Sequence, residues 1–196
     1  MKNALILHGT DADHSHNWFP WLKTQLEALG WVAWVPDLPG ADAPNIERYN
    51  AFLIEQLGQA VRGGGFEKRR GLNGDSVIIG HSSGAVEILG LLNEIALAEP
   101  VAACFLVGVF RGDLGWDNLK GMNADFDFEV IKTKSRKFVF IHSDNDPYCP
   151  LEHAEYLSMK LGGKLIFIPG QGHFTTSLDP SYTKFPKLLE IIKQEV

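Results

Sequence analysis

Residues 77–85 read Val77-Ile78-Ile79-Gly80-His81-Ser82-Ser83-Gly84-Ala85. An uninterrupted apolar run leads into the pattern Gly-x-Ser-x-Gly, and a segment with helical periodicity follows. This order predicts a buried strand, a sharp turn and then a helix, the arrangement that holds a nucleophilic serine in a strained conformation with its hydroxyl exposed. We therefore predict that Ser82 is a nucleophile and that the backbone N–H of Ser83 points at the same spot.

The rest of the chain alternates in the same way. Short, nearly continuous apolar runs predict strands near residues 3–7, 31–36, 76–79, 102–107, 138–141 and 164–168. Amphipathic segments predict helices over residues 18–29, 45–61, 83–98, 151–161 and 186–194. Strands buried on both faces and separated by helices are typical of a mostly parallel six-stranded sheet with helices on both faces.

The chain shows no internal repeat and no linker, so we expect residues 1–196 to form a single domain. Residues 111–134 follow neither period clearly. We expect a short lid or a partly helical segment there, because the stretch is too short for a full cap domain.

Composition excludes several classes of protein. The chain has 196 residues, 45% of them hydrophobic, and a formal net charge of −6, so it lacks the broad positive field that nucleic acid binding requires. The only basic cluster, residues 68–70, is short and fits a solvated loop. No apolar run approaches the roughly 20 residues of a membrane span, and no secretory signal is visible. Two cysteines without a disulfide pattern favour a cytoplasmic location, and nothing in the sequence indicates an oligomeric state.

A serine hydroxyl needs a general base to act as a nucleophile. In the α/β-hydrolase fold the catalytic groups follow the chain order Ser, Asp or Glu, then His. Three histidines lie downstream of Ser82: His142, His153 and His173. His173 follows the last predicted strand in a glycine-rich turn, where a loop can place an imidazole over a strand end, so we predict it as the base. His142 fits a structural group at a strand end, and His153 fits the surface of a helix.

Two carboxylates compete for the role of orienting the base. Asp144 and Asp146 both follow the predicted strand at 138–141, and either one could instead be a turn-forming residue. A second backbone donor for an oxyanion is expected in the loop after the first strand. We predict the N–H of Thr10 for it, with Asp11 as the alternative.

The loop before the first helix contains other polar groups. Four of its side chains could in principle bind a divalent metal, but their spacing matches no known ligand pattern, so we predict neither a metal nor a cofactor: Asp11, Asp13, His14 and His16. His16 and Trp18 stand where the helix nearest the site begins, and we consider both as pocket residues. Cys149 lacks a neighbouring motif and is not expected to be a nucleophile.

Taken together, these motifs resemble the small single-domain α/β-hydrolase-fold serine hydrolases of the retinoblastoma-binding protein 9 type. The resemblance rests on five segments: His8-Gly9, His16-Asn17-Trp18, Gly-His-Ser-Ser-Gly at 80–84, Ser-Asp-Asn-Asp-Pro at 143–147 and Gly-His-Phe at 172–174. It implies that Asp146, the aspartate before the proline, is the triad acid. It also implies hydrolysis of small esters or amides, by a carboxylesterase-like enzyme or a peptidase or amidase.

The sequence departs from this pattern in two places. The loop at 62–74 is longer than expected, and Asp11-x-Asp13 stands where glycines are expected. A Leu-x-Cys-x-Glu segment is absent, so binding to a pocket protein is not transferred to this chain. Two alternatives to hydrolysis stay open: a non-catalytic binding protein on a hydrolase fold, and an acyltransferase that uses the same triad.

Overall fold

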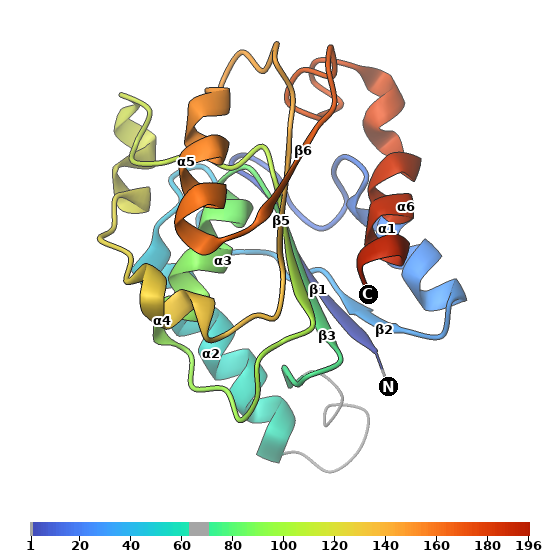
Figure 1. Ribbon diagram of the computed structural model, residues 1–196, viewed down its shortest axis with the longest axis vertical. Coiled ribbons are helices and arrows are strands. Elements are labelled where there is room, and N and C mark those ends of the chain that lie inside the picture. Colours follow the sequence, from blue (N-terminus) through green and yellow to red (C-terminus); the bar gives the residue numbers. More distant parts are fainter. Residues whose placement is uncertain (1, 63–70) are drawn as a thin grey trace.

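One open sheet of six parallel strands, in the order β2-β1-β3-β4-β5-β6, forms the centre of the molecule (Figure 1). The computed structural model describes residues 2–62 and 71–196. The strands are β1 (Asn3–Leu7), β2 (Val32–Trp34), β3 (Ser76–His81), β4 (Ala103–Val107), β5 (Phe138–His142) and β6 (Lys164–Phe167). The predicted sheet is thereby confirmed. Residues 63–70, with the basic cluster and most of the predicted long loop, lie outside the described residues.

Helices cover the sheet on both faces, as predicted. They are α1 (Phe19–Ala28), α2 (Ile46–Arg62), α3 (Ser83–Glu94), α4 (Phe128–Lys132), α5 (Leu151–Leu161) and α6 (Pro186–Glu195). Helices α1 and α6 lie on one face, and α2 to α5 lie on the other (Figure 1). Within the described part of the chain, no helix combines the length and the apolar character needed to span a membrane.

Some boundaries differ from the sequence-based prediction. Strand β2 keeps only three residues of the predicted 31–36, since its pairing with β1 ends at Trp34. Helix α3 ends at Glu94 instead of residue 98 because Ile95 adopts an extended backbone. The segment 111–134 is partly helical: it contains the 3₁₀ helix η2 (Asp117–Met122) and helix α4.

A buried acidic residue lies in helix α3, on the side that packs against α2. Glu87 has no exposed surface, and neither of its carboxyl oxygens has a hydrogen-bond partner among the described residues. The same is true of the Tyr49 hydroxyl and the Asn50 Oδ1 on the neighbouring helix α2. Burial first, and the charge of Glu94 second, raise the pKa of Glu87 well above its usual value. The uncharged carboxyl is therefore the form that this site favours.

We predict that Glu87→Gln stabilises the protein, and increasingly so as the pH rises. The folded pKa lies above the unfolded one, so the cost of keeping Glu87 buried grows as the pH rises above its unfolded value. A glutamine avoids that cost, and the gain should grow by up to about 1.4 kcal/mol per pH unit. Urea unfolding at pH 4, 6 and 8 measures it. Glu27→Gln, an exposed position on helix α1 at the opposite face of the sheet, serves as the control. An equal loss of stability for Glu87→Gln at every pH would contradict the prediction.

Candidate active site

The turn between β3 and α3 holds Ser82 in an unusual backbone conformation. Its φ is 56° and its ψ is −124°, a region that residues with a side chain rarely occupy. Its N–H donates to the carbonyl oxygen of Val107 on β4 over 2.9 Å, which ties the turn to the next strand. The predicted order of strand, sharp turn and helix is what the structure shows.

Three glycines make room for this turn. A Cβ on Gly80 would collide with the carbonyl oxygen of Gly84, and a Cβ on Gly84 would collide with that of His8. A Cβ on Gly9 would lie 2.9 Å from the Cβ of Ser82. Both glycines of the motif, and the one after β1, are therefore required by close backbone approach.

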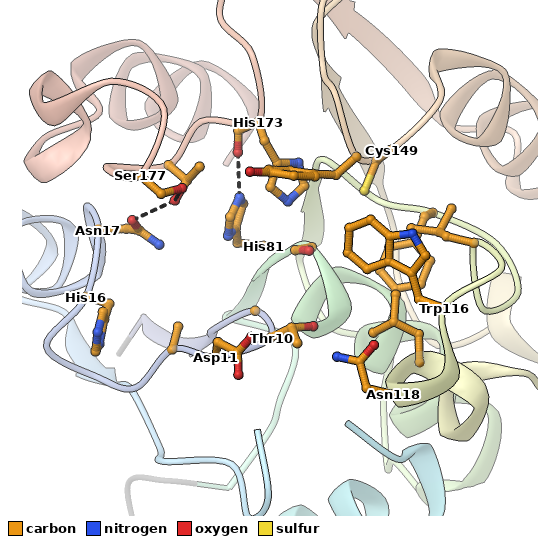
Figure 2. Close-up of a pocket in the computed structure, with 18 of the residues that line it drawn as sticks. Thr10, Asp11, His16, Asn17, His81, Trp116, Asn118, Cys149, His173 and Ser177 are labelled. Carbon is orange, nitrogen blue, oxygen red and sulfur yellow. Dashed lines mark hydrogen bonds between the residues drawn. The ribbon is translucent and has the colours of Figure 1, made fainter. Parts of the chain in front are cut away.

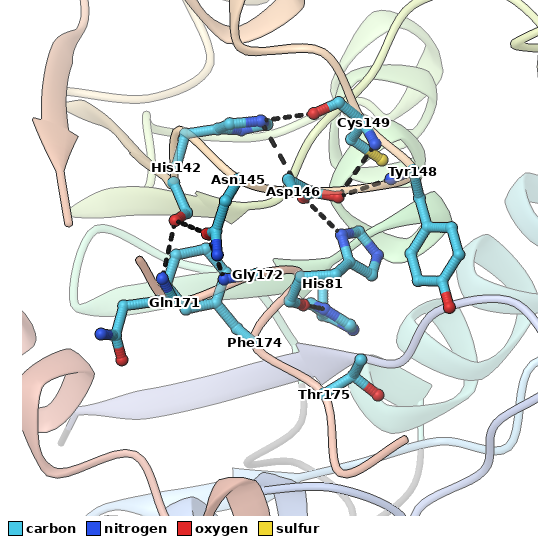
Figure 3. A network of polar contacts seen from close by, with 12 residues as sticks. His81, His142, Asn145, Asp146, Tyr148, Cys149, Gln171, Gly172, Phe174 and Thr175 are labelled. Carbon is cyan, nitrogen blue, oxygen red and sulfur yellow. Dashed lines mark hydrogen bonds and ion pairs between the residues drawn. The ribbon is translucent and has the colours of Figure 1, made fainter. Parts of the chain in front are cut away.

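Asp146 and His173 form a short hydrogen-bonded pair. His173 Nδ1 donates to Asp146 Oδ2 over 2.6 Å, and Asp146 Oδ1 accepts from the N–H groups of Tyr148 (2.9 Å) and Cys149 (3.0 Å) (Figure 3). Burial alone would raise the pKa of Asp146, but the hydrogen bond and charge of His173 and the two backbone donors outweigh it, so the pKa stays below its ordinary value. An ionised Asp146 holds the proton of His173 on Nδ1 and leaves Nε2 as the acceptor.

The turn before His173 is clamped by the loop after β5. Three consecutive N–H groups donate to three consecutive side chains: Gly170 to Asp144 (2.7 Å), Gln171 to Ser143 (2.9 Å) and Gly172 to Asn145 (2.7 Å). We call Ser143, Asp144 and Asn145 the loop clamp. The two aspartates that the sequence left open therefore have different positions: Asp144 supports the turn, and Asp146 faces the imidazole.

Ser82 and His173 line one cavity of about 400 Å³ (Figure 2). Thr10 lines it as well, and its hydroxyl donates to Ser83 Oγ over 3.1 Å, which joins the loop after β1 to the start of α3. The N–H of Asp11, the alternative oxyanion donor, is already bonded to the carbonyl oxygen of Ala41 over 2.9 Å.

The structure places the two predicted pocket residues in different surroundings. His16 lines the cavity, but Trp18 does not. Trp18 is completely buried in the core beneath α1 and α6, and its Nε1 donates to the carbonyl oxygen of Phe174 over 3.1 Å. The expectation of a pocket role for Trp18 is corrected accordingly: both its apolar surface and its single donor are used inside the protein.

Sequence reasoning missed two residues that position His173. His81 is buried, and its Nε2 donates to the carbonyl oxygen of His173 over 2.8 Å. Burial first, and the charge of His173 second, lower the pKa of His81 to about 3, so it is neutral near pH 7. Gly108 follows β4 with φ 59°, and a Cβ there would lie 3.0 Å from the imidazole of His173. His81 lies within the Gly-His-Ser-Ser-Gly motif and Gly108 follows a predicted strand, but the sequence assigns neither of them a role.

The polar loop before α1 is organised by contacts between histidine and aspartate side chains. His14 Nδ1 lies 2.8 Å from Asp37 Oδ1, and His16 Nδ1 lies 2.8 Å from Asp13 Oδ1. Ligand atoms of Asp13, His14 and Asp37 lie within 4.8 Å of one another, but all of them are at least partly exposed to solvent. This arrangement is accounted for by pairing between side chains.

Comparison with known proteins shows the family of the chain. The sequence profile named "Serine hydrolase" matches residues 4–194. The chain belongs to the serine hydrolase family. This serine hydrolase is 25% identical over 193 residues to YdeN of Bacillus subtilis, a match that covers 97% of the chain and 94% of YdeN. It is 24% identical over 183 residues to the serine hydrolase RBBP9 of Rattus norvegicus, covering 91% and 86% of the two chains. The predicted family resemblance is confirmed.

Solved structures show the same fold. The ydeN gene product from B. subtilis has a TM-score of 0.85 at 24% identity, with 100% of this serine hydrolase and 98% of that chain covered. Est1E from Butyrivibrio proteoclasticus has a TM-score of 0.66 at 14% identity, with 98% and 88% covered. The predicted α/β-hydrolase fold is therefore confirmed.

We predict that Gly108→Ala lowers the hydrolase activity by at least about 100-fold, because the new methyl group displaces the imidazole of His173. Gly162→Ala is the matched control. Gly162 has a similar φ of 62°, but its Cβ would meet no atom within 4 Å. Both variants should lose a similar stability of about 1–2 kcal/mol from backbone strain, measured by thermal unfolding. Equal activity in the two variants would show that the approach of Gly108 to His173 is unimportant.

Proposed function

We propose that this serine hydrolase cleaves a small ester or amide through an acyl-enzyme, with Ser82, His173 and Asp146 as its triad. The observation that supports this most is the 2.6 Å Asp146–His173 pair at the wall of the cavity lined by the strained Ser82. A short bond of this kind is expected between a base and its orienting acid, and the strained turn and shared cavity support Ser82 as the nucleophile.

The reaction would follow two steps. The Oγ of Ser82 attacks the carbonyl carbon while Nε2 of His173 takes its proton, and the same proton then passes to the departing alcohol or amine as its bond to the carbonyl breaks. Water next attacks the acyl-enzyme, with His173 as base again, and the acid and free Ser82 are released. Neither step calls for a metal or cofactor.

The developing oxyanion would be held by the backbone N–H groups of Ser83 and Thr10. Ser83 is the first residue of α3, where N–H groups have no partner within the helix and the helix dipole favours negative charge. The N–H of Asp11 is bonded to Ala41, which favours Thr10 as the second donor. Donors fixed by the backbone stabilise charge without reorganising during the reaction.

The cavity size fits a small molecule and supports a carboxylesterase-like enzyme, with peptidase or amidase activity as the neighbouring possibility. We also propose a cytoplasmic location, which agrees with two buried, free cysteines, Cys104 and Cys149.

We predict that Ser82→Ala abolishes hydrolysis of p-nitrophenyl acetate, with a loss of at least about 1000-fold in kcat. Labelling by a fluorophosphonate probe should occur in the wild type and be lost in Ser82→Ala. Absence of labelling in a folded wild type would instead favour the non-catalytic binding protein. Formation of a new ester when an alcohol is added would favour the acyltransferase.

Substitutions of the two aspartates in the loop after β5 should differ sharply in their effect on kcat. We predict that Asp146→Asn lowers kcat by about 10⁴-fold, because the asparagine favours the wrong tautomer of His173. Asp144→Asn keeps an oxygen that can accept the N–H of Gly170, so its loss should stay within about tenfold. Steady-state kinetics at pH 7 tests both, and a larger loss for Asp144→Asn would reverse the assignment.

A further inference from the structure

The cavity beside Ser82 has two chemically different ends. The lining includes an apolar group, Phe110, Leu114, Trp116, Leu119 and Tyr148, with the polar Asn118 beside it, and a polar group, Asp11, His16, Asn17, Thr176 and Ser177. Figure 2 shows Trp116 and Asn118 on one side, His16, Asn17 and Ser177 on the other, and His81 and Thr10 between them. A substrate that spans the nucleophile therefore meets an apolar wall in one direction and a polar rim in the other.

The apolar wall is fixed in place before any ligand binds. The carboxylate of Asp113 accepts from the N–H of Gly115 (2.9 Å) and the side chain of Asn123 (2.9 Å), and the Asp113 carbonyl accepts from the N–H of Trp116 (2.8 Å). The Trp116 ring then meets the Tyr148 ring edge to face at 6.0 Å. Preorganised apolar surface binds apolar groups at a low entropic cost.

The polar rim is also held in place by hydrogen bonds, which centre on Asn17. Its Oδ1 accepts from the Thr175 hydroxyl (3.1 Å) and from both the N–H (2.9 Å) and the hydroxyl (2.8 Å) of Thr176. Since the oxygen is occupied, the amide nitrogen is the end available to a ligand, and Figure 2 shows it turned toward the cavity.

The charge of the rim limits what it can bind. Asp11 contributes a carboxylate to the cavity, and no lysine or arginine of the described residues lines it. An anionic group would be repelled here, whereas hydroxyl groups or a cation would find acceptors and a matching charge.

The two ends also differ in depth. At the apolar end Phe110 and Leu119 are almost fully buried, although Trp116 and Tyr148 are 46% and 36% exposed, whereas at the polar end Asp11, His16 and Ser177 are all exposed. The acyl group stays covalently attached while the leaving group departs first. The buried apolar surface of Phe110 and Leu119 suits the group that is retained, and the exposed polar end suits the group that is released.

We infer, on the basis of the proposed function, that the preferred substrates are esters of an apolar acid with a polar, non-anionic alcohol. The acyl chain lies against the wall at Trp116, and the alcohol lies at the rim formed by Asp11 and Asn17. The substrate class is thus an uncharged or cationic ester, such as an acyl ester of a polyol or of an amino alcohol.

The acyl side is tested with p-nitrophenyl acetate, butyrate and hexanoate. In the wild type, kcat/KM should rise at least about tenfold from acetate to hexanoate, and in Trp116→Ala this rise should shrink to within about threefold. Phe167→Ala is the control, because Phe167 is 48% exposed, like Trp116 at 46%, but lies outside the cavity on strand β6. Thermal unfolding of both variants, together with Trp116→Phe as a milder change, separates lost packing from lost specificity.

The alcohol side is tested with four butyrate esters, those of methanol, glycerol, choline and glycolate, by titrating the released acid. The glycerol and choline esters should be hydrolysed at least about tenfold faster than the anionic glycolate ester, and Asp11→Asn should narrow that gap. Glu129→Gln removes one negative charge from an exposed position outside the cavity and should leave the gap unchanged.

Three outcomes would overturn the inference. A flat acyl series in the wild type removes the apolar acyl site, and equal rates for all four alcohols remove the polar rim. An effect of Trp116→Ala on the alcohol series alone reverses the orientation. In each case Ser82-dependent turnover of p-nitrophenyl acetate would leave the proposed function standing; loss of that turnover and of fluorophosphonate labelling would overturn both.

Discussion

The left-handed backbone of Ser82 is the constraint on which the rest of the site depends. A φ of 56° is costly for serine, and it persists because the surroundings leave no alternative. The N–H of Ser82 is held by Val107, and glycines allow the turn to lie against the loop after β1. Strand β3 lies inside the sheet, between β1 and β4, so the strained turn rests on a part of the fold that cannot easily shift.

His173 approaches this turn from the loop that follows β6. Strands β5 and β6 are neighbours, and the loop clamp joins the segments that follow them. His81 adds a bond from the elbow itself to the backbone of His173. Ser82, His173 and Asp146 are thus positioned relative to one another by hydrogen bonds between side chains and backbone groups at the strand ends.

Much of this arrangement could be predicted from the sequence, because some features are local. The elbow needs a strand, two glycines and a helix in succession, and the order Ser, Asp, His is a property of the topology. The choice between Asp144 and Asp146 was not local, since it depends on which carboxylate the turn at 170–172 captures. Trp18 was misplaced because a tryptophan at a helix start looks the same whether its ring faces a cavity or the core. His81 and Gly108 act through contacts across strands that no spacing encodes.

The position of β6 at an edge of the sheet determines how easily the site can lose its geometry. The strand forms one edge of the sheet and has a single neighbour, whereas β3 has two. Edge elements open in local fluctuations at a lower free energy than central ones. Detachment of this edge would carry His173 away from a turn at Ser82 that stays folded, so local opening at β6 would separate these two residues before the centre of the sheet unfolds.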